Sequence, residues 1–151
     1  VPSYLWNPTT GTFTDTSGSQ YTTVTRAGTG ADTFKAALYL TTATLGAGTT
    51  AYSATNEVSG TNYSPGGVTV TNATAPTTSG TTAYWTPSGS LVYSGVTLTT
   101  AFDCVLIYNS TQSNKAVSVH TFGSQTVTAG TFTLTMPTNN TSTALLRLAT
   151  T

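Results

Sequence analysis

The sequence predicts an all-β protein: an antiparallel β-sandwich, jelly-roll-like or Ig-like, with an extended N-terminal arm. Short runs of alternating apolar and polar residues recur along the chain, separated by turn residues about every 8–12 positions. Roughly a quarter of the residues are threonine, which is β-branched and favours strands. No segment shows a convincing helical period. Together these observations are typical of a sandwich of short antiparallel strands.

The length of 151 residues suits one domain with an arm. We expect residues 1–31 to form the arm and residues 32–151 the sandwich domain. The arm is rich in Thr, Ser and Gly and carries four spaced aromatic residues: Tyr4, Trp6, Phe13 and Tyr21. Because disordered segments are poor in aromatics, we expect this arm to order against another surface, such as a neighbouring subunit. The alternative is a first strand or hairpin of the same domain.

The first predicted strand covers residues 33–40, where Phe34, Ala36 and Leu38 alternate with more polar positions. Ala, Lys and Leu also favour helices, but the period of two favours a strand. Residues 41–63 then form a long connection containing several glycines. Connections of this length inside compact domains are usually functional or binding elements.

The long connection ends in the tight turn Ser64-Pro65-Gly66-Gly67. Pro65 presets φ at the first central position of a turn, and Gly66 supplies the positive φ that a type II turn needs at the second. Pro65, Gly66 and Gly67 are therefore predicted to be structural turn residues. A strand over residues 68–74 follows from the alternation of Val and Thr.

Asn56, Glu57 and Tyr63 are the predicted interface residues of the connection, together with the four aromatics of the arm. Glu57 is the only glutamate of the chain. We interpret it as a lone charge that pins the loop, with Lys35 or Arg26 as its partner, rather than as a catalytic acid.

The remaining pattern predicts short strands at residues 81–86, 91–93, 96–99, 102–108, 115–122, 126–128, 131–136 and 144–148. Turns are predicted at residues 77–80, 109–114, 123–125 and 138–143. The nearly continuous apolar run at 102–108 is typical of a strand buried on both faces. Gly95 and Gly130 are candidate β-bulges. In the last strand we expect Leu146 and Leu148 to point inward and Arg147 outward.

The chain carries very little charge: 5% of its residues are charged and the formal net charge is zero. Nucleic-acid affinity rests on Lys and Arg neutralising phosphates, so no nucleic-acid partner is expected. Near-zero net charge promotes association, which suits a protein that works in an assembly; a secreted protein with a threonine-rich surface is the alternative. No apolar run is long enough to span a membrane, so no membrane partner is expected.

Side chains that carry chemistry are few, and we predict no catalytic, cofactor-binding or metal-binding residue and no enzyme activity. The acids lie far apart in the sequence: Asp15, Asp32, Glu57 and Asp103. A glycosidase needs two carboxyl groups facing one cleft, and nothing singles out a pair. His120 is expected to be a structural residue. Cys104 lies in the most apolar strand, where it is expected to be an inert small hydrophobe.

An aromatic platform for sugars is the best small-ligand hypothesis. Aromatic rings could stack on a pyranose while Asn and Thr side chains bind its edge; the candidates are Trp6, Tyr84, Trp85 and Tyr93. The alternative places Trp85 in the core and Trp6 in the arm.

Two stretches carry a resemblance: FKAALYL followed by NEVSGTNYSPGGVTV, and NKAVSVHTFGSQTVTAGTFTLTMP followed by ALLRL. Over roughly residues 33–148 the chain resembles small structural proteins of tailed bacteriophages that are encoded among head and tail genes. The resemblance implies a virion structural protein, namely a decoration or cement protein on the outer capsid surface. It implies the major capsid protein as a partner and no cofactor. Because closed symmetric oligomers are the rule for such assemblies, we also expect further copies of the chain as partners, in a trimer or dimer.

Residues 1–31 lie outside this resemblance. The second hypothesis is a glycan- or receptor-binding module of a head fibre or tail.

Overall fold

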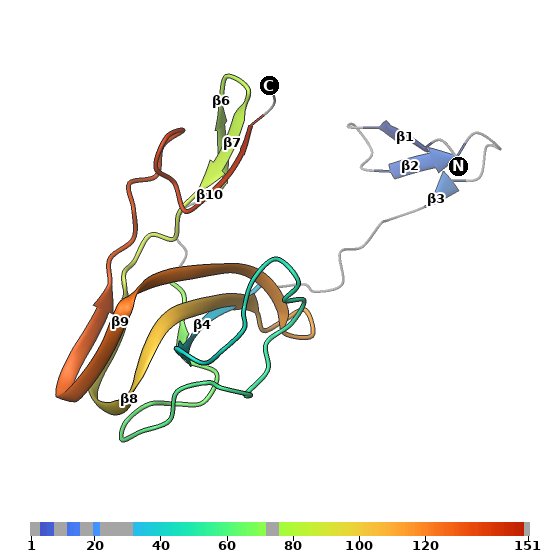
Figure 1. Ribbon diagram of the computed structural model, residues 1–151. Helices are drawn as coiled ribbons and strands as arrows, with labels where there is room; N and C mark the ends of the chain where they lie inside the picture. Colours follow the sequence, from blue (N-terminus) through green and yellow to red (C-terminus); the bar gives the residue numbers. More distant parts are fainter. Residues whose placement is uncertain (1–3, 8–11, 16–19, 22–31, 72–75, 150–151) are drawn as a thin grey trace. The chain divides into compact units, whose positions relative to one another are not determined.

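The computed structural model describes residues 4–7, 12–15, 20–21, 32–71 and 76–149, the first three ranges as backbone only (Figure 1). The chain divides into two compact units, Val1–Ala31 and Asp32–Thr151. Every regular element in the described part is a strand, and every strand pairing is antiparallel. No described segment forms a helix that could span a membrane. The all-β prediction is therefore confirmed, whereas the sandwich arrangement, jelly-roll-like or Ig-like, stays a prediction.

The first unit is a three-stranded sheet in the order β1-β2-β3, formed by Tyr4–Asn7, Thr12–Asp15 and Gln20–Tyr21. In its register, Trp6 stands opposite Phe13, and Phe13 stands opposite Tyr21. Three of the four aromatic residues of this unit thus occupy neighbouring register positions. Their side chains lie outside the described residues, so the predicted arm and its docking surface stay predictions.

The second unit is built on a four-stranded sheet in the order β5-β4-β8-β9. Its strands are β4 (Phe34–Leu40), β5 (Val68–Thr69), β8 (Leu91–Asn109) and β9 (Lys115–Leu134). β8 and β9 form one long hairpin. Of the residues of β8, only those of its second half, from Phe102 to Asn109, pair with β4. The first half of β8 is therefore free to bend away from β4 (Figure 1).

Several strands that the sequence separates are continuous in the structure. The bulges predicted at Gly95 and Gly130 are confirmed, and they lie inside continuous strands. Gly95 has φ +61° at a register shift between Tyr93 and Val96. Gly130 follows Ala129, which has φ +47°, and also lies in a shifted part of the ladder. The turn predicted at residues 123–125 is wrong, because these residues lie inside β9 where its register with β8 is irregular. These irregularities let the long hairpin curl.

The larger core lies inside the curl of this hairpin. Leu91, Val96 and Leu98 from the first half of β8 pack in one cluster with Phe102 and Ile107 from its second half. On the opposite face of the sheet, β4 and β8 contribute a second cluster: Ala37, Tyr39, Cys104, Leu106 and Tyr108. Residues of the long connection cover this second face. The prediction that residues 102–108 are buried on both faces is confirmed.

A smaller sheet in the order β10-β7-β6 is formed by Leu146–Ala149, Thr82–Trp85 and Thr77–Ser79. The Leu145 amide donates to Thr86 Oγ1 at 3.0 Å, which ties β10 to the end of β7. Two predictions are wrong here. Residues 77–79 form a strand instead of a turn, and the side chain of Leu148 is 81% exposed instead of pointing inward.

Candidate functional site

The Glu57 carboxylate organises the long connection that follows β4. Its Oε2 accepts a hydrogen bond from the Tyr52 hydroxyl at 2.7 Å. Its Oε1 accepts from the Tyr63 hydroxyl at 2.8 Å and from the Gly66 amide at 2.7 Å. One side chain thereby joins three points of the connection. Among the described residues its donors are tyrosine hydroxyls and a backbone amide, and Lys35 is not one of them.

Two tyrosines on the strands complete the cluster. The Tyr39 hydroxyl, on β4, donates to the Ser53 carbonyl at 2.6 Å. The Tyr108 hydroxyl, on β8, donates to the Gly66 carbonyl at 2.9 Å, and its ring stacks on Tyr52 with centroids 4.7 Å apart. We call Tyr39, Tyr52, Glu57, Tyr63 and Tyr108 the tyrosine clamp. It fastens the connection to the central strands of the sheet.

The turn at the end of the connection has type II geometry. The Gly67 amide donates to the Ser64 carbonyl at 2.9 Å, and Gly66 has φ +87° at the second central position, after Pro65. Gly67 also has a positive φ and passes very close to β4. A Cβ atom there would lie 1.7 Å from the Ala36 carbonyl oxygen, so only glycine fits. The turn therefore locks the connection against the buried sheet.

The connection also covers an edge of β4. The Leu40 amide donates to the Asn56 carbonyl at 2.9 Å, and the Val58 amide donates to the Leu38 carbonyl at 3.0 Å. The Leu38 amide in turn donates to the Tyr63 hydroxyl at 3.0 Å. Backbone groups that a sheet edge would leave open are thus satisfied by this loop.

The predicted interface residues of the connection are distributed unevenly over surface and core. Asn56 is exposed and has φ +61°, a conformation that Asn tolerates better than most residues. Glu57 is half-buried in the tyrosine clamp. Tyr63 is only 8% exposed and stacks on Tyr93, with ring centroids 6.0 Å apart, so it serves the interior of this chain.

The surroundings of the tyrosine clamp keep its hydroxyl groups neutral. Burial raises the pKa of Tyr39 to about 12, and the nearby Glu57 carboxylate adds to the shift. The pKa values of Tyr52, Tyr63 and Tyr108 are also raised, first by burial and then by the negative charge of Glu57. The clamp thus holds one carboxylate among neutral hydroxyl donors.

We expect the folded chain to lose stability in alkali. An unfolded tyrosine ionises near its ordinary pKa of 10.0, whereas the clamp tyrosines resist ionisation in the folded state. Their contribution is therefore fully present below pH 10 and is lost as the pH rises from 10 towards the Tyr39 value of about 12. Thermal melts across this range, with tyrosinate absorbance recorded in parallel, should show the melting temperature falling before the tyrosines of the folded protein ionise. A melting temperature that stays constant as the pH rises above 10 would contradict this expectation.

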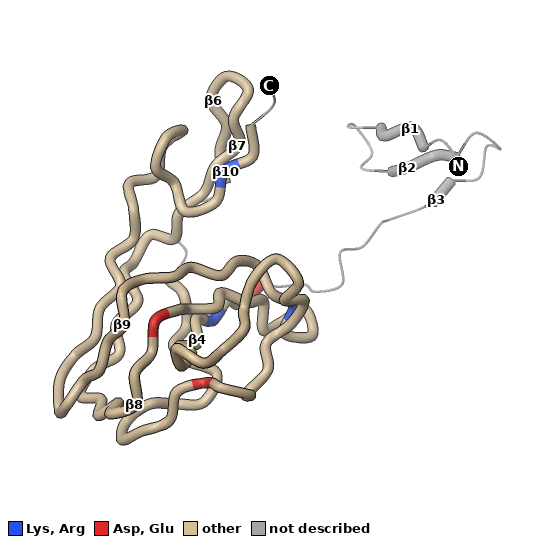
Figure 2. The backbone as a smooth tube through the Cα atoms, viewed as in Figure 1, with Lys and Arg blue, Asp and Glu red and all other residues tan. Residues whose placement is uncertain are grey.

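Other ionisable or nucleophilic side chains also have partners within the chain. Asp32 accepts from Asn109 Nδ2 at 2.9 Å and from Gln112 Nε2 at 3.4 Å, which holds the turn between β8 and β9. Burial, with the charge of Asp103 added, raises the pKa of the Cys104 thiol to about 11. His120 Nε2 lies 2.9 Å from Ser118 Oγ, and burial lowers its pKa. No group of three or more metal-ligating side chains gathers within the described residues. Figure 2 shows the described charges as scattered, isolated positions.

Two of the candidate residues for the sugar-binding platform are buried. Trp85 is 7% exposed and Tyr93 is 2% exposed, so their faces are not available to a ligand. The Tyr93 hydroxyl is used inside the chain, where it donates to the Ala36 carbonyl at 2.9 Å. For Trp85 and Tyr93 the platform prediction is wrong, Tyr84 is half-buried, and the Trp6 side chain lies outside the described residues.

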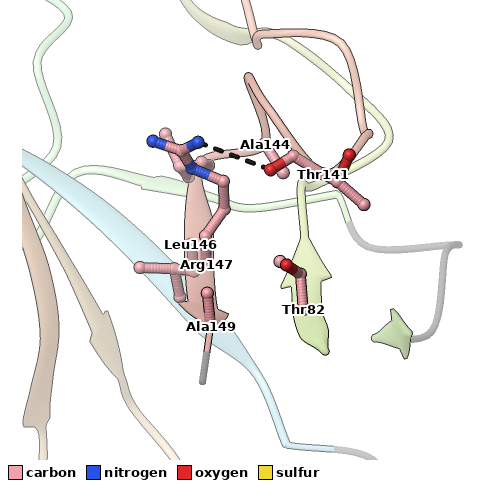
Figure 3. Close-up of a pocket in the computed structure, with 7 residues that line it drawn as sticks. Thr82, Thr141, Ala144, Leu146, Arg147 and Ala149 are labelled. Atoms are coloured by element: carbon pink, nitrogen blue, oxygen red, sulfur yellow. Dashed lines mark hydrogen bonds between the residues drawn. The ribbon is translucent and has the colours of Figure 1, made fainter. Parts of the chain in front are cut away.

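Shallow grooves lie on the surface of the second unit. A groove of about 530 Å³ runs beside β10, where Arg147 turns back towards Thr141 (Figure 3). Arg147 Nη1 donates to the backbone carbonyls of Ser142, at 2.5 Å, and Thr141, at 3.4 Å. A groove of about 400 Å³ lies between residues 45–49 and the start of β9.

Sequence reasoning missed Tyr39, Tyr52 and Tyr108 as site residues. A usable signal was present for Tyr39 and Tyr108, because each lies in a predicted strand, and the strand of Tyr108 was predicted to be buried on both faces. A buried tyrosine hydroxyl usually finds a hydrogen-bond partner, and the only glutamate lies in the adjoining connection. Their meeting at Glu57 depends on the path of the connection, which no local pattern specifies.

Comparison of the chain with protein-family models, with curated proteins and with solved structures finds no match. The fold and the geometry of the site define an all-β protein whose longest connection is fixed to the sheet by a tyrosine clamp.

Proposed function

We propose that this chain is a virion structural protein of the decoration type, which binds the outer surface of a capsid and stabilises it. The observation that carries the proposal is the structural role of Glu57. The only glutamate of the chain accepts the hydrogen bonds that fix its longest connection. Asp32 likewise has a structural role, because it accepts hydrogen bonds at the turn between β8 and β9. The resemblance of residues 33–148 to structural proteins of tailed phages supports the same role.

A fixed connection suits binding to a large preformed surface. Association costs free energy when loops must be ordered at the interface, and a loop that is already held by hydrogen bonds avoids most of this cost. Exposed positions of the connection, such as Asn56 and Thr55, are polar but uncharged. Contacts of this kind depend little on salt, because salt screens charges and not neutral hydrogen bonds.

The expected partners are the major capsid protein and further copies of this chain. Homo-oligomers with closed symmetry are the rule for soluble assemblies, which fits a dimer or trimer at a capsid symmetry axis. The aromatic residues of the first unit are proposed as additional anchors, since Trp and Tyr dominate the binding energy of interfaces.

A map of the particle and a stability assay test this proposal together. We expect density for this chain on the outer capsid surface, and we expect capsids that lack it to release DNA at a lower temperature than complete capsids. Removing residues 1–31 should weaken retention on the capsid. Location on the tail, unchanged stability of the stripped capsids, or binding of the purified chain to host glycans in place of capsids would argue against a decoration role.

A further inference from the structure

The connection covers one edge of the main sheet, but most of the opposite edge, on β9, has no described strand paired to it. The connection covers β4, as described above, and on the opposite side it reaches only the first residues of β9. There Ala51 pairs with Lys115, the Tyr52 amide donates to the Asn114 carbonyl at 2.9 Å, and the Ala116 amide donates to the Thr50 carbonyl at 3.0 Å. Within the described chain, residues 117–121 make no backbone hydrogen bond outside their ladder with β8.

This open stretch has limits set by the structure. Thr50 and Ala51 occupy the edge up to Ala116. The register with β8 is regular from Ser118 to Thr121. It shifts after Thr121, and it also shifts between Ser118 and Ala116, where Val117 has no partner on β8. The free segment of residues 117–121 is therefore about as long as a typical β-strand.

The free segment lacks the charges that usually protect an edge. Natural sheet edges carry Lys, Pro or inward-pointing charges that discourage pairing with another chain. Residues 117–121 read VSVHT and contain no Lys, Arg, Asp, Glu or Pro. The one lysine of β9, Lys115, lies where the edge is already covered. Beside the segment runs the groove of about 400 Å³, which offers space next to the edge.

We propose that residues 117–121 of β9 pair antiparallel with the same segment of a second copy of this chain, across a two-fold axis near Val119. A neutral edge on a chain of zero net charge meets its own copy without repulsion, and it offers nothing that would attract a basic or acidic partner.

The side chains fit this self-pairing. With the axis at Val119, this residue faces its own copy and Val117 faces Thr121 of the second copy, and cross-strand pairs of β-branched residues are favourable. Ser118 then faces His120 of the second copy. These two residue types already lie within hydrogen-bond distance inside one chain, with His120 Nε2 2.9 Å from Ser118 Oγ.

The oligomeric state of the full chain tests the inference, using a matched pair of variants. Val117 and Val92 are both exposed valines on the main sheet, at 37% and 45%, but only Val117 lies on the free edge. We expect the unaltered chain to dimerise with rising concentration in sedimentation experiments. Val117→Lys should raise the dissociation constant by roughly tenfold, since it sets a charge on the paired edge, and Val92→Lys should leave it unchanged.

Hydrogen–deuterium exchange of the unaltered chain supplies a second readout that needs no variant. The amides of residues 117–121 should become more protected as the dimer forms. A chain that stays monomeric, a dimer equally affected by both substitutions, or protection that appears elsewhere would overturn the inference. The inference rests on the self-association that the proposed function includes. The capsid location is measured separately, so a monomeric chain would overturn the inference without deciding the capsid role.

Discussion

Replacing Gly67 by alanine should lower the free energy of unfolding by about 3 kcal/mol or more. Gly67 has φ +74°, where a side chain is strained, and a Cβ would lie 1.7 Å from the Ala36 carbonyl oxygen and 2.7 Å from the Cα of Ala37. Ala36 and Ala37 have no exposed surface, so the strand that carries them cannot move aside without disturbing both cores. The turn and β4 would have to separate.

Urea unfolding of the purified chain measures this effect. Gly123→Ala is the matched control, because a Cβ there meets nothing within 4 Å and the residue has no positive φ. We expect the control to change stability by less than about 0.5 kcal/mol. Equal unfolding midpoints for the two variants would contradict the close contact between the turn and β4.

Glu57→Gln should destabilise the fold by about 2 kcal/mol and loosen the connection before the rest of the domain unfolds. The amide keeps one acceptor oxygen but turns an NH₂ group towards hydroxyl and amide donors. The hydrogen bonds from Tyr52, Tyr63 and Gly66 to the carboxylate cannot all survive. Since Tyr63 is 8% exposed, a hydroxyl that loses its acceptor there gains little from water.

Hydrogen–deuterium exchange and thermal melts separate the local from the global part of this effect. We expect faster exchange of the amides of Leu40, Val58 and Gly66, which the connection protects. Asp103→Asn is the control, because it removes the same charge from a half-buried carboxylate outside the clamp. If both variants melt alike and exchange alike, Glu57 does not hold the connection.

The strands of the main sheet could be predicted from alternation, but their continuity could not. Gly95 and the residues near Gly130 interrupt the apolar pattern, and a glycine in a strand is compatible with a strand end or with a bulge. Only the partner strand decides between them, because a bulge continues the ladder on the other side of the gap. In the same way, residues 123–125 have the composition of a turn, yet pairing with β8 keeps them within β9.

The inward position predicted for Leu148 failed for a related reason. Alternation assigns residues to two faces of a strand, but it cannot show that a face meets a core. β10 belongs to a small sheet, and Leu148 has nothing packed over it: its side chain is 81% exposed.

The candidate site was predicted in outline and missed in its chemistry. The type II turn at Pro65 and Gly66 could be predicted because it depends on the local backbone preferences of these two residues. The pinning role of Glu57 was inferred from its isolation, with a cation expected as partner. The structure supplies tyrosine hydroxyls instead, brought together by β4, β8 and the connection from positions that are distant in sequence.

The curled hairpin also has a consequence for how the chain reaches its fold. Most of the larger core comes from residues 91–134, so its two walls are close together in sequence. Contacts between residues that are near in sequence cost less loop-closure entropy and form early in folding. We therefore expect β8 and β9 to form the folding nucleus and β4, which comes earlier in the chain, to add to it later. In this molecule β4 is translated before the hairpin on which it depends, so it waits for β8 and β9 to be synthesised.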